Sequence, residues 1–415
     1  MMRGRFGQRK EWLAGAFLLT LTLINVASVC KLAPMLRKGY QDFTAFYGAA
    51  KMVRDGQIAR LYDLDALYQV EKQFAPEVPI RQAALPYNHT PFEVLVWLPF
   101  AYLNYLPAYV AWTVFNIVLL ILSLRMVRSR FPEVGEFSLI FLLLAVGAFV
   151  PVVIALMQGQ DPILLVFAFT LGLTLLEEGR DVAAGAALGL GLFKFHFVIP
   201  LALILSVRRP RVLLGIIPVG AMWILVSALM VGWGGLVEFV QFSWRLEKSG
   251  AGGAISSVGM PNLRGLIAEL PGIVGGSVFA VSLTMVCSVV VMGVAAWVVA
   301  RSEVPVSCLF AVASVASILV SYHAIIHDVA WLVVVVLLLF CAPGGGTRSE
   351  MRIDVILLMV VYAIFLSSSR WPWVAPLWSV PVVIWILRKY RHDYAAEAAV
   401  RSGRGRVRIT ISMGR

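Results

Sequence analysis

Residues 212–232 read VLLGIIPVGAMWILVSALMVG, a run of 21 residues without a charged side chain. A helix of about 20 apolar residues is long enough to cross the hydrocarbon core of a bilayer. Similar runs recur from Trp12 to Leu387 without a long hydrophilic stretch between them. Of the 415 residues, 60% are hydrophobic and 14% are charged, whereas a soluble domain has roughly 25% charged residues. The sequence therefore predicts an all-α polytopic membrane protein.

The basic residues predict how the chain is oriented. Lys and Arg gather in short segments between the apolar runs, which is typical of cytoplasmic loops. With these segments and the N-terminus placed inside, about 12 transmembrane helices alternate and both termini are cytoplasmic. The predicted spans are 12–34, 108–128, 136–157, 160–177, 182–194, 196–206, 212–232, 274–300, 304–321, 328–342, 352–367 and 372–388. Segment 91–104 is then a re-entrant or juxtamembrane helix, and 182–206 is a pair of short helices that breaks around Lys194 to His196.

The apolar pattern predicts one membrane domain, residues 1–393, followed by a basic cytoplasmic tail, 394–415, that faces anionic lipid. Its two large outer loops are 36–90 and 233–273. No small-residue cleavage site follows the first apolar run, so this run is expected to be a retained helix and not a signal peptide. Because many of the basic residues behind the net charge of +12 lie in short loops, no nucleic-acid partner is expected.

The predicted topology brings the unusual polar residues to the outer face of the membrane. An ionisable residue at bilayer depth costs about 2.5–3.5 kcal/mol on insertion scales, so such residues near helix ends are functional candidates. They are Asp42, His89, Lys194, His196, His323 and Asp328.

The first outer loop is expected to hold two amphipathic juxtamembrane helices. Residues 43–54 carry an apolar stripe at helical spacing, and Gly56 ends it. A second helix begins after Asp65, with Leu67, Val70 and Phe74 on one side. Asp42 precedes the first helix, where it can act as an N-cap or as a general base at the membrane interface.

Several motifs, in this order, resemble glycosyltransferase family 87 over roughly residues 40–370. They are Asp42-x-x-x-Phe46-Tyr47-x-Ala49-Ala50, Gly56 with Leu61-Tyr62-Asp63, Tyr87-Asn88-His89-Thr90-Pro91-Phe92, Gly159-Gln160, Gly185 to Lys194, Asn262-Leu263-Arg264-Gly265, and Ser321-Tyr322-His323 with Asp328. The sequence departs from the family at Asn88-His89-Thr90-Pro91, where Tyr-x-Pro-Pro is usual, and at Lys194-Phe195-His196, where Lys-Pro is frequent. Donor or acceptor preference is therefore expected to differ from that of better-known members.

The resemblance implies a polyprenyl-phosphate-dependent enzyme of the GT-C superfamily, of the mannosyltransferase type. Such an enzyme moves a sugar, mannose-like by family precedent, from a polyprenyl-phosphate carrier to a lipid or glycan acceptor on the extracytoplasmic face of a bacterial inner membrane. The transfer is expected to invert the anomeric carbon. Its general base would be Asp42, with Asp328 as second choice. Lys194, His196, Arg264 and His323 would hold the donor phosphate. The residues expected to contact substrate are Asn88, His89, Gln158, Gln160, Asn262 and Tyr47.

Structural roles remain open for several of these residues. Lys194 can snorkel from a short helix, His196 can pack among phenylalanines, and the two glutamines can cap a helix end. His323 and His327 have a metal-ligand spacing, but no third outer-face His or Cys follows at the expected spacing, so neither a metal nor a cofactor is expected.

Two other functions remain as alternatives. A transporter or flippase for a polyprenyl-linked lipid would place its ionisable residues near the midplane within inverted repeats, and no such repeat is visible. An acyl or phosphoryl transferase would need a Ser/His or metal constellation. A nucleotide-sugar donor is disfavoured because the glycines of 185–191 lie in an apolar helix and not after a strand.

Overall fold

The computed structural model describes residues 2–36, 38–39, 41–75, 83–249, 257–274, 276–301, 305–342 and 347–389. Within these ranges the chain forms helices and no strand, in agreement with the predicted all-α class. The elements are α1 (Met2–Leu36), α2 (Phe43–Arg54), η1 (Ile58–Arg60), α3 (Leu64–Phe74), η2 (Pro91–Glu93), α5 (Val94–Trp97), η3 (Leu98–Tyr102), α6 (Tyr105–Arg130), α7 (Pro132–Gly135), α8 (Leu139–Ala148), α9 (Val150–Gln158), α10 (Pro162–Glu177), α11 (Asp181–Gly189), η4 (Leu192–Lys194), α12 (Phe195–Ser206), α13 (Arg211–Ser249), α14 (Leu263–Ala268), α15 (Val278–Arg301), α16 (Val306–Val320), η5 (Ile326–Trp331), α17 (Leu332–Cys341), α18 (Arg348–Ser368) and η6 (Pro372–Trp378). A last helical segment covers 379–389, and the predicted tail 394–415 lies outside the described residues.

Fewer helices are long enough to cross a membrane than the sequence predicts. Five qualify by length and composition, in α1, α6, α13, α15 and α18, and two bent pairs raise the number to seven. The expected number of about 12 is not confirmed. Predicted spans 160–177, 304–321 and 328–342 are apolar helices, but they have only 10–17 residues, whereas a span needs about 20.

Two predicted segments form bent helix pairs. The predicted pair in 182–206 is confirmed, with α11 and residues 192–206 at an angle of 70°, but the bend lies at Leu190 and Gly191 and not around Lys194 to His196. Segment 136–157 was expected to be one span, yet α8 and α9 meet at 69°. Phe149 is extended at this bend, with φ −80° and ψ 102°, and Pro151 in the first turn of α9 cannot donate the backbone hydrogen bond that a continuous helix would need.

The first outer loop forms two helices, although their position at the membrane surface is not confirmed. Nine of the 12 residues of α2 are buried, so this helix packs inside a small cluster instead of exposing one face. Helix α3 begins two residues earlier than predicted because the carboxylate of Asp63, at the N-cap, accepts hydrogen bonds from the amides of Asp65 and Ala66.

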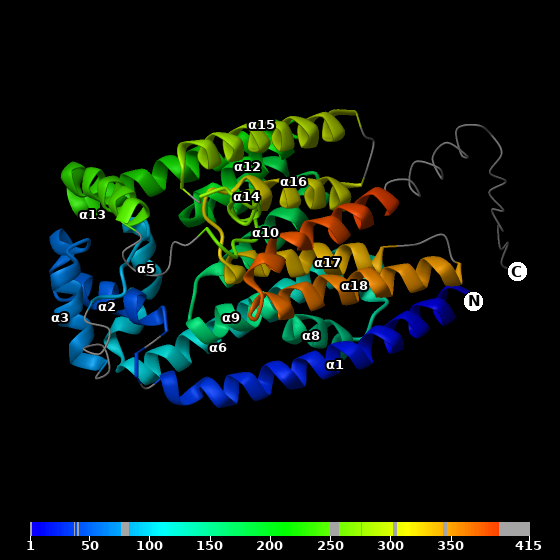
Figure 1. Ribbon diagram of the computed structural model, residues 1–415, viewed down its shortest axis with the longest axis horizontal. Helices are drawn as coiled ribbons and strands as arrows, with labels where there is room; N and C mark the ends of the chain where they lie inside the picture. The colour runs from blue at the N-terminus through cyan, green and yellow to red at the C-terminus, as the bar shows by residue number, and fades with distance from the viewer. Residues whose placement is uncertain are drawn as a thin grey trace, which may run out of the picture.

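The segment expected to be the second outer loop, 233–273, begins with helix. Gly232 has φ 70° and ψ 174°, which are not helical values, so α13 consists of two helical halves that meet at this residue, and the second half ends at Ser249. The ring of Tyr62 lies 5.5 Å from that of Phe239 and 5.4 Å from that of Phe242. The second half of α13 therefore covers the first outer loop, and these elements gather at one end of the molecule, with the start of α1 at the other end (Figure 1).

The outer surface of the long helices is apolar. Only 11% of the most apolar 18-residue window of α15 and 22% of that of α13 are buried. Large side chains such as Leu229, Val278 and Val289 are more than 70% exposed. Such a surface needs lipid as its solvent.

Helices α11 and α13 contact each other through their backbones at two glycines. A Cβ atom at Gly185 would overlap the carbonyl oxygen of Val212, and one at Gly215 would overlap that of Val182. Small residues let apolar helices approach closely in a membrane. This contact fixes α11, and with it the break before Lys194.

We expect Gly185→Ala to lower stability by about 1–3 kcal/mol, the typical effect of overpacking a close contact. The measurement is thermal unfolding of the purified protein in detergent. Gly293→Ala in α15 is the matched control, because nothing lies within 4 Å of a Cβ at Gly293. Equal melting temperatures for the two variants would show that the α11–α13 contact is not this close.

Candidate functional site

Lys194 is the centre of a buried ion-pair cluster at the break between α11 and α12. Its Nζ lies 3.3 Å from Oδ1 of Asp161 and 3.0 Å from Oδ1 of Asp328. The Lys194 side chain is 8% exposed, and the two carboxylates are at most 1% exposed. Asp161 begins α10 and Asp328 lies in η5, and α9 and α10 both pack against η5. One ammonium group thus joins three helix termini that are distant in the sequence.

His89 and Glu93 extend this cluster on the side of Asp161. Nδ1 of His89 lies 3.1 Å from the Glu93 carboxylate and 3.7 Å from Oδ2 of Asp161. The Glu93 side chain is fully buried. Burial and, to a lesser extent, the Lys194 charge lower the pKa of His89 to about 4, although the Asp161 carboxylate acts against this shift. The imidazole is therefore neutral at neutral pH.

Aromatic rings hold His89 in place. The ring of Phe46 lies 4.6 Å from the imidazole and also stacks against Trp97, at 4.1 Å. The Tyr62 hydroxyl donates a hydrogen bond of 2.9 Å to the backbone oxygen of His89. Helix α2 therefore supplies one wall of the site through Phe46.

Asp42 lies at the start of α2 but does not cap it. Its side chain makes no capping hydrogen bond. Instead its Oδ2 accepts a 2.7 Å hydrogen bond from Nε2 of Gln160, and its backbone N–H donates to Oε1 of Gln158 at 3.3 Å. The N-cap alternative is therefore wrong for the Asp42 side chain, which the turn between α9 and α10 orients.

Gly159 allows this turn to approach α2. It has φ 64°, in the left-handed region that favours glycine, and it ends α9. A Cβ at Gly159 would lie 2.6 Å from Cβ of Phe43, the residue after Asp42. Because Gln160 bonds Asp42 and the next residue, Asp161, pairs with Lys194, this turn connects Asp42 to the ion-pair cluster.

The other predicted phosphate-binding residues come from three segments: His196 from α12, Arg264 from α14 and His323 from the segment after α16. The ring of His196 lies 6.4 Å from that of His323, and its buried Nε2 has no hydrogen-bond partner among the described residues. Arg264 donates a 3.2 Å hydrogen bond to the backbone oxygen of Tyr322 and lies 4.4 Å from the centre of its ring. His327 contacts Asp328 at 3.7 Å, and neither it nor His323 belongs to a candidate metal group in the described ranges.

Three predicted substrate-binding side chains use their polar atoms within the protein. The Tyr47 hydroxyl donates to the backbone oxygen of Leu103 at 2.7 Å. Oδ1 of Asn88 accepts from Ser243 at 2.7 Å. The fully buried amide of Asn262 caps α14 through the Gly265 N–H and donates to the backbone oxygen of Ser321. These bonds give each side chain a structural role.

The structure brings together most of the predicted site and adds two residues to it. Asp42, His89, Lys194 and Asp328 meet around the turn that carries Gln158 and Gln160. Glu93 and Asp161 were not predicted as site residues. The signal for each was a carboxylate beside an apolar run, and Glu93 also lies one helical turn after His89.

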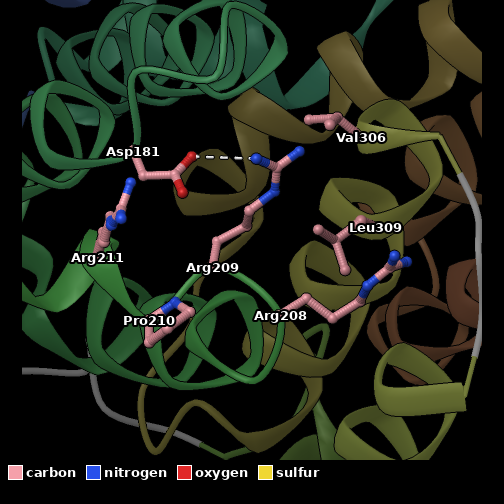
Figure 2. Close-up of a pocket in the computed structure, with 7 residues that line it drawn as sticks. All are labelled: Asp181, Arg208, Arg209, Pro210, Arg211, Val306 and Leu309. Atoms are coloured by element: carbon pink, nitrogen blue, oxygen red, sulfur yellow. Dashed lines mark hydrogen bonds and ion pairs between the residues drawn. The ribbon is translucent and has the colours of Figure 1, made fainter.

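A second polar site, a surface pocket, lies away from this cluster. A pocket of about 380 Å³ is lined by Asp181, Arg208, Arg209, Pro210, Arg211, Val306 and Leu309. In Figure 2, Arg209 points to Asp181, with which it pairs at 3.4 Å, and Arg211 approaches Asp181 from the other side. The pocket lies at the N-terminal end of α16, whereas His323 and Asp328 follow its C-terminal end. Basic side chains therefore lie at the N-terminal end of α16, and the acidic cluster lies beyond its C-terminal end.

We expect Lys194→Met to destabilise the fold by about 3–5 kcal/mol, because it leaves two buried carboxylates without their cation. Adding Asp161→Asn should recover part of the loss, since one of those charges is removed. Thermal unfolding in detergent measures both effects, with Lys51→Met on α2, a partly exposed lysine without an ion pair among the described residues, as control. A Lys194 variant as stable as the Lys51 variant would contradict the ion-pair cluster.

Comparison with known proteins identifies the family. Residues 87–322, more than half of the chain, match the model of glycosyltransferase family 87. No curated protein and no solved structure matches the chain significantly. The matched range includes His89, Glu93, Asp161 and Lys194. The chain therefore belongs to glycosyltransferase family 87 and is a membrane glycosyltransferase.

Proposed function

We propose that the protein transfers a sugar from a polyprenyl-phosphate carrier to a lipid or glycan acceptor, with inversion at the anomeric carbon and with Asp42 as general base. The family supports sugar transfer in a membrane. The carrier, the GT-C type of architecture and a mannose-like sugar rest on the resemblance of the sequence motifs. The family match gives no support to the transporter alternative.

The observation that carries the proposal is the difference between the two candidate bases. Asp328 is 1% exposed, its Oδ1 faces Lys194, and its Oδ2 accepts the Ile325 N–H at 2.8 Å. Asp42 is only partly buried, and within the described chain its one side-chain hydrogen bond comes from Gln160. A general base needs a lone pair that can reach a substrate proton. Asp42 meets this requirement, and Asp328 does not.

In the proposed reaction, Asp42 accepts the proton of an acceptor hydroxyl as the oxygen attacks the anomeric carbon of the sugar. The bond from that carbon to the phosphate oxygen breaks, and the polyprenyl phosphate leaves with the bonding electron pair. Gln158 and Gln160 adjoin Asp42, so they are the predicted substrate-binding residues best placed to contact a sugar hydroxyl. Attack from the face opposite the phosphate gives inversion.

The leaving phosphate needs positive charge or hydrogen-bond donors, because its negative charge grows in the transition state. Lys194 adjoins the site, but two carboxylates already neutralise its charge. His196, His323 and Arg264 remain as the proposed donors. The free Nε2 of His196 supports this assignment, since a buried nitrogen without a partner is costly unless a ligand satisfies it.

The distribution of charge supports an extracytoplasmic site. Three arginines line the pocket at the N-terminal end of α16, and the acidic cluster adjoins its other end. Basic residues mark the cytoplasmic side of membrane proteins. We therefore place Asp42 on the outer side of a bacterial inner membrane, with both termini in the cytoplasm.

We expect Asp42→Asn to lower the rate of sugar transfer by about 10²–10⁴-fold, the typical contribution of one positioned base. The isosteric amide keeps an oxygen that can accept the Gln160 hydrogen bond, so the fold should persist. The assay is transfer of radiolabelled sugar from polyprenyl-phosphate donors to membrane-lipid extract in proteoliposomes. Asp65→Asn, an exposed carboxylate on α3 in the same outer loop, is the control and should retain full activity.

Two results would contradict this mechanism. Equal rates for the wild type and a folded Asp42→Asn variant would exclude Asp42 as the base. Absence of transfer by the wild type from every polyprenyl-phosphate donor, together with transfer from a different sugar donor, would exclude the proposed carrier.

A further inference from the structure

The cluster around Lys194 contains more acidic than basic groups. Glu93, Asp161 and Asp328 are at most 1% exposed, and Lys194 is the one lysine or arginine that contacts any of them among the described residues. If all three carboxylates are ionised, the buried cluster carries two uncompensated negative charges. Burying uncompensated charge is strongly unfavourable, so protons or a cation must balance it.

Carboxylate oxygens outnumber hydrogen-bond donors mainly around Asp161 and Glu93. Both oxygens of Asp161 are buried, and neither has a geometrically good hydrogen bond in the part of the chain that the structure describes. Oε1 of Glu93, also buried, lies 3.1 Å from Nδ1 of His89, and the Glu93 carboxyl group adjoins that of Asp161. Oδ1 of Asp161 faces Lys194 at 3.3 Å, whereas its Oδ2 faces His89 at 3.7 Å. A ligand between Asp161, Glu93 and His89 would therefore not compete with Lys194 for the same oxygen.

These three residues have the geometry of a cation site. One ligand atom from each of His89, Glu93 and Asp161 lies within 4.8 Å of the other two. Ligands about 2.0–2.2 Å from a shared ion are separated by at most about 4.4 Å, so small side-chain movements close the site. Phe46 contacts the His89 ring and itself stacks against Trp97, which restricts the position of the imidazole.

We propose that His89, Glu93 and Asp161 bind one divalent cation. Two positive charges balance the buried cluster: three carboxylates, one ammonium and one divalent ion sum to zero. A mixed set of one imidazole and two carboxylates suits Mn²⁺ or Zn²⁺ better than Mg²⁺ or Ca²⁺, which prefer oxygen ligands alone. Three protein ligands leave open coordination positions for a substrate oxygen.

The role of this ion rests on the proposed function. Lys194 cannot offer its full charge to a leaving phosphate, because Asp161 and Asp328 both hold it. A divalent cation beside Asp161 restores a positive centre next to Gln160 and Asp42. It would bind an oxygen of the donor phosphate and stabilise the charge that develops as the sugar leaves.

Cation binding can be measured without any sugar substrate. The full chain is purified in detergent, stripped with EDTA, desalted and titrated with Mn²⁺ while the free ion is followed by electron paramagnetic resonance. We expect one bound Mn²⁺ per chain, competed by Zn²⁺. Glu93→Gln and Asp161→Asn should each weaken binding by more than about tenfold, since even partners of metal ligands contribute about 10–100-fold. Asp65→Asn, outside the cluster, should bind like the wild type.

A second measurement on the wild type protects the test against variants that do not fold. The spin echo of bound Mn²⁺ should carry ¹⁴N modulation from one imidazole, and His89→Gln should remove this modulation. The proposal fails if the stripped wild type binds no stoichiometric Mn²⁺ or Zn²⁺, or if the folded carboxylate variants bind like the wild type. A protein that transfers sugar but binds no cation would refute this inference alone, whereas cation binding without polyprenyl-linked transfer would refute the proposed donor alone.

Discussion

The site depends on one buried ammonium group. Lys194 pairs with Asp161 at 3.3 Å and with Asp328 at 3.0 Å, in surroundings that leave the two carboxylates almost without contact with water. Neither carboxylate could remain ionised there without it. The pairs join the break between α11 and α12 to the start of α10 and to η5. Because Gln160 precedes Asp161 and bonds Asp42, the position of the first outer loop also depends on Lys194.

This arrangement gives the two candidate bases, Asp42 and Asp328, different chemistry. Asp328 satisfies its oxygens with Lys194 and a backbone amide, so it stabilises the fold. Asp42 receives one side-chain hydrogen bond and stays partly exposed. A residue held by a single neutral donor keeps its orientation while a lone pair remains for a substrate. The same contrast explains why the N-cap position of Asp42 does not make it a structural residue.

Composition and apolar runs were sufficient to predict an all-helical membrane protein, and the break in 182–206 followed from its polar residues. The number of spans could not be predicted in this way. Helices α10, with 16 residues, and α15, with 24, are both strongly apolar, but only the longer one can cross a bilayer. Gln160 reaches Asp42 across 118 positions, and Lys194 meets Asp328 from another element. Spacing in one sequence does not reveal such contacts, so Glu93 and Asp161 were missed although both are charged residues beside apolar runs.

The short helices also determine the depth of the site. Helix α16 has 15 residues, about 22 Å at 1.5 Å per residue, against a hydrocarbon core of about 30 Å. With the arginine pocket of its N-terminal end at one membrane surface, its other end stops below the opposite surface. His323 and Asp328 then lie within the thickness of the bilayer. The proposed polyprenyl-linked donor would lie in that layer and could bring its sugar–phosphate bond to Asp42 by lateral movement. A soluble nucleotide sugar would have to bury its charged phosphates to reach the same place, and this energetic difference favours a lipid-linked donor.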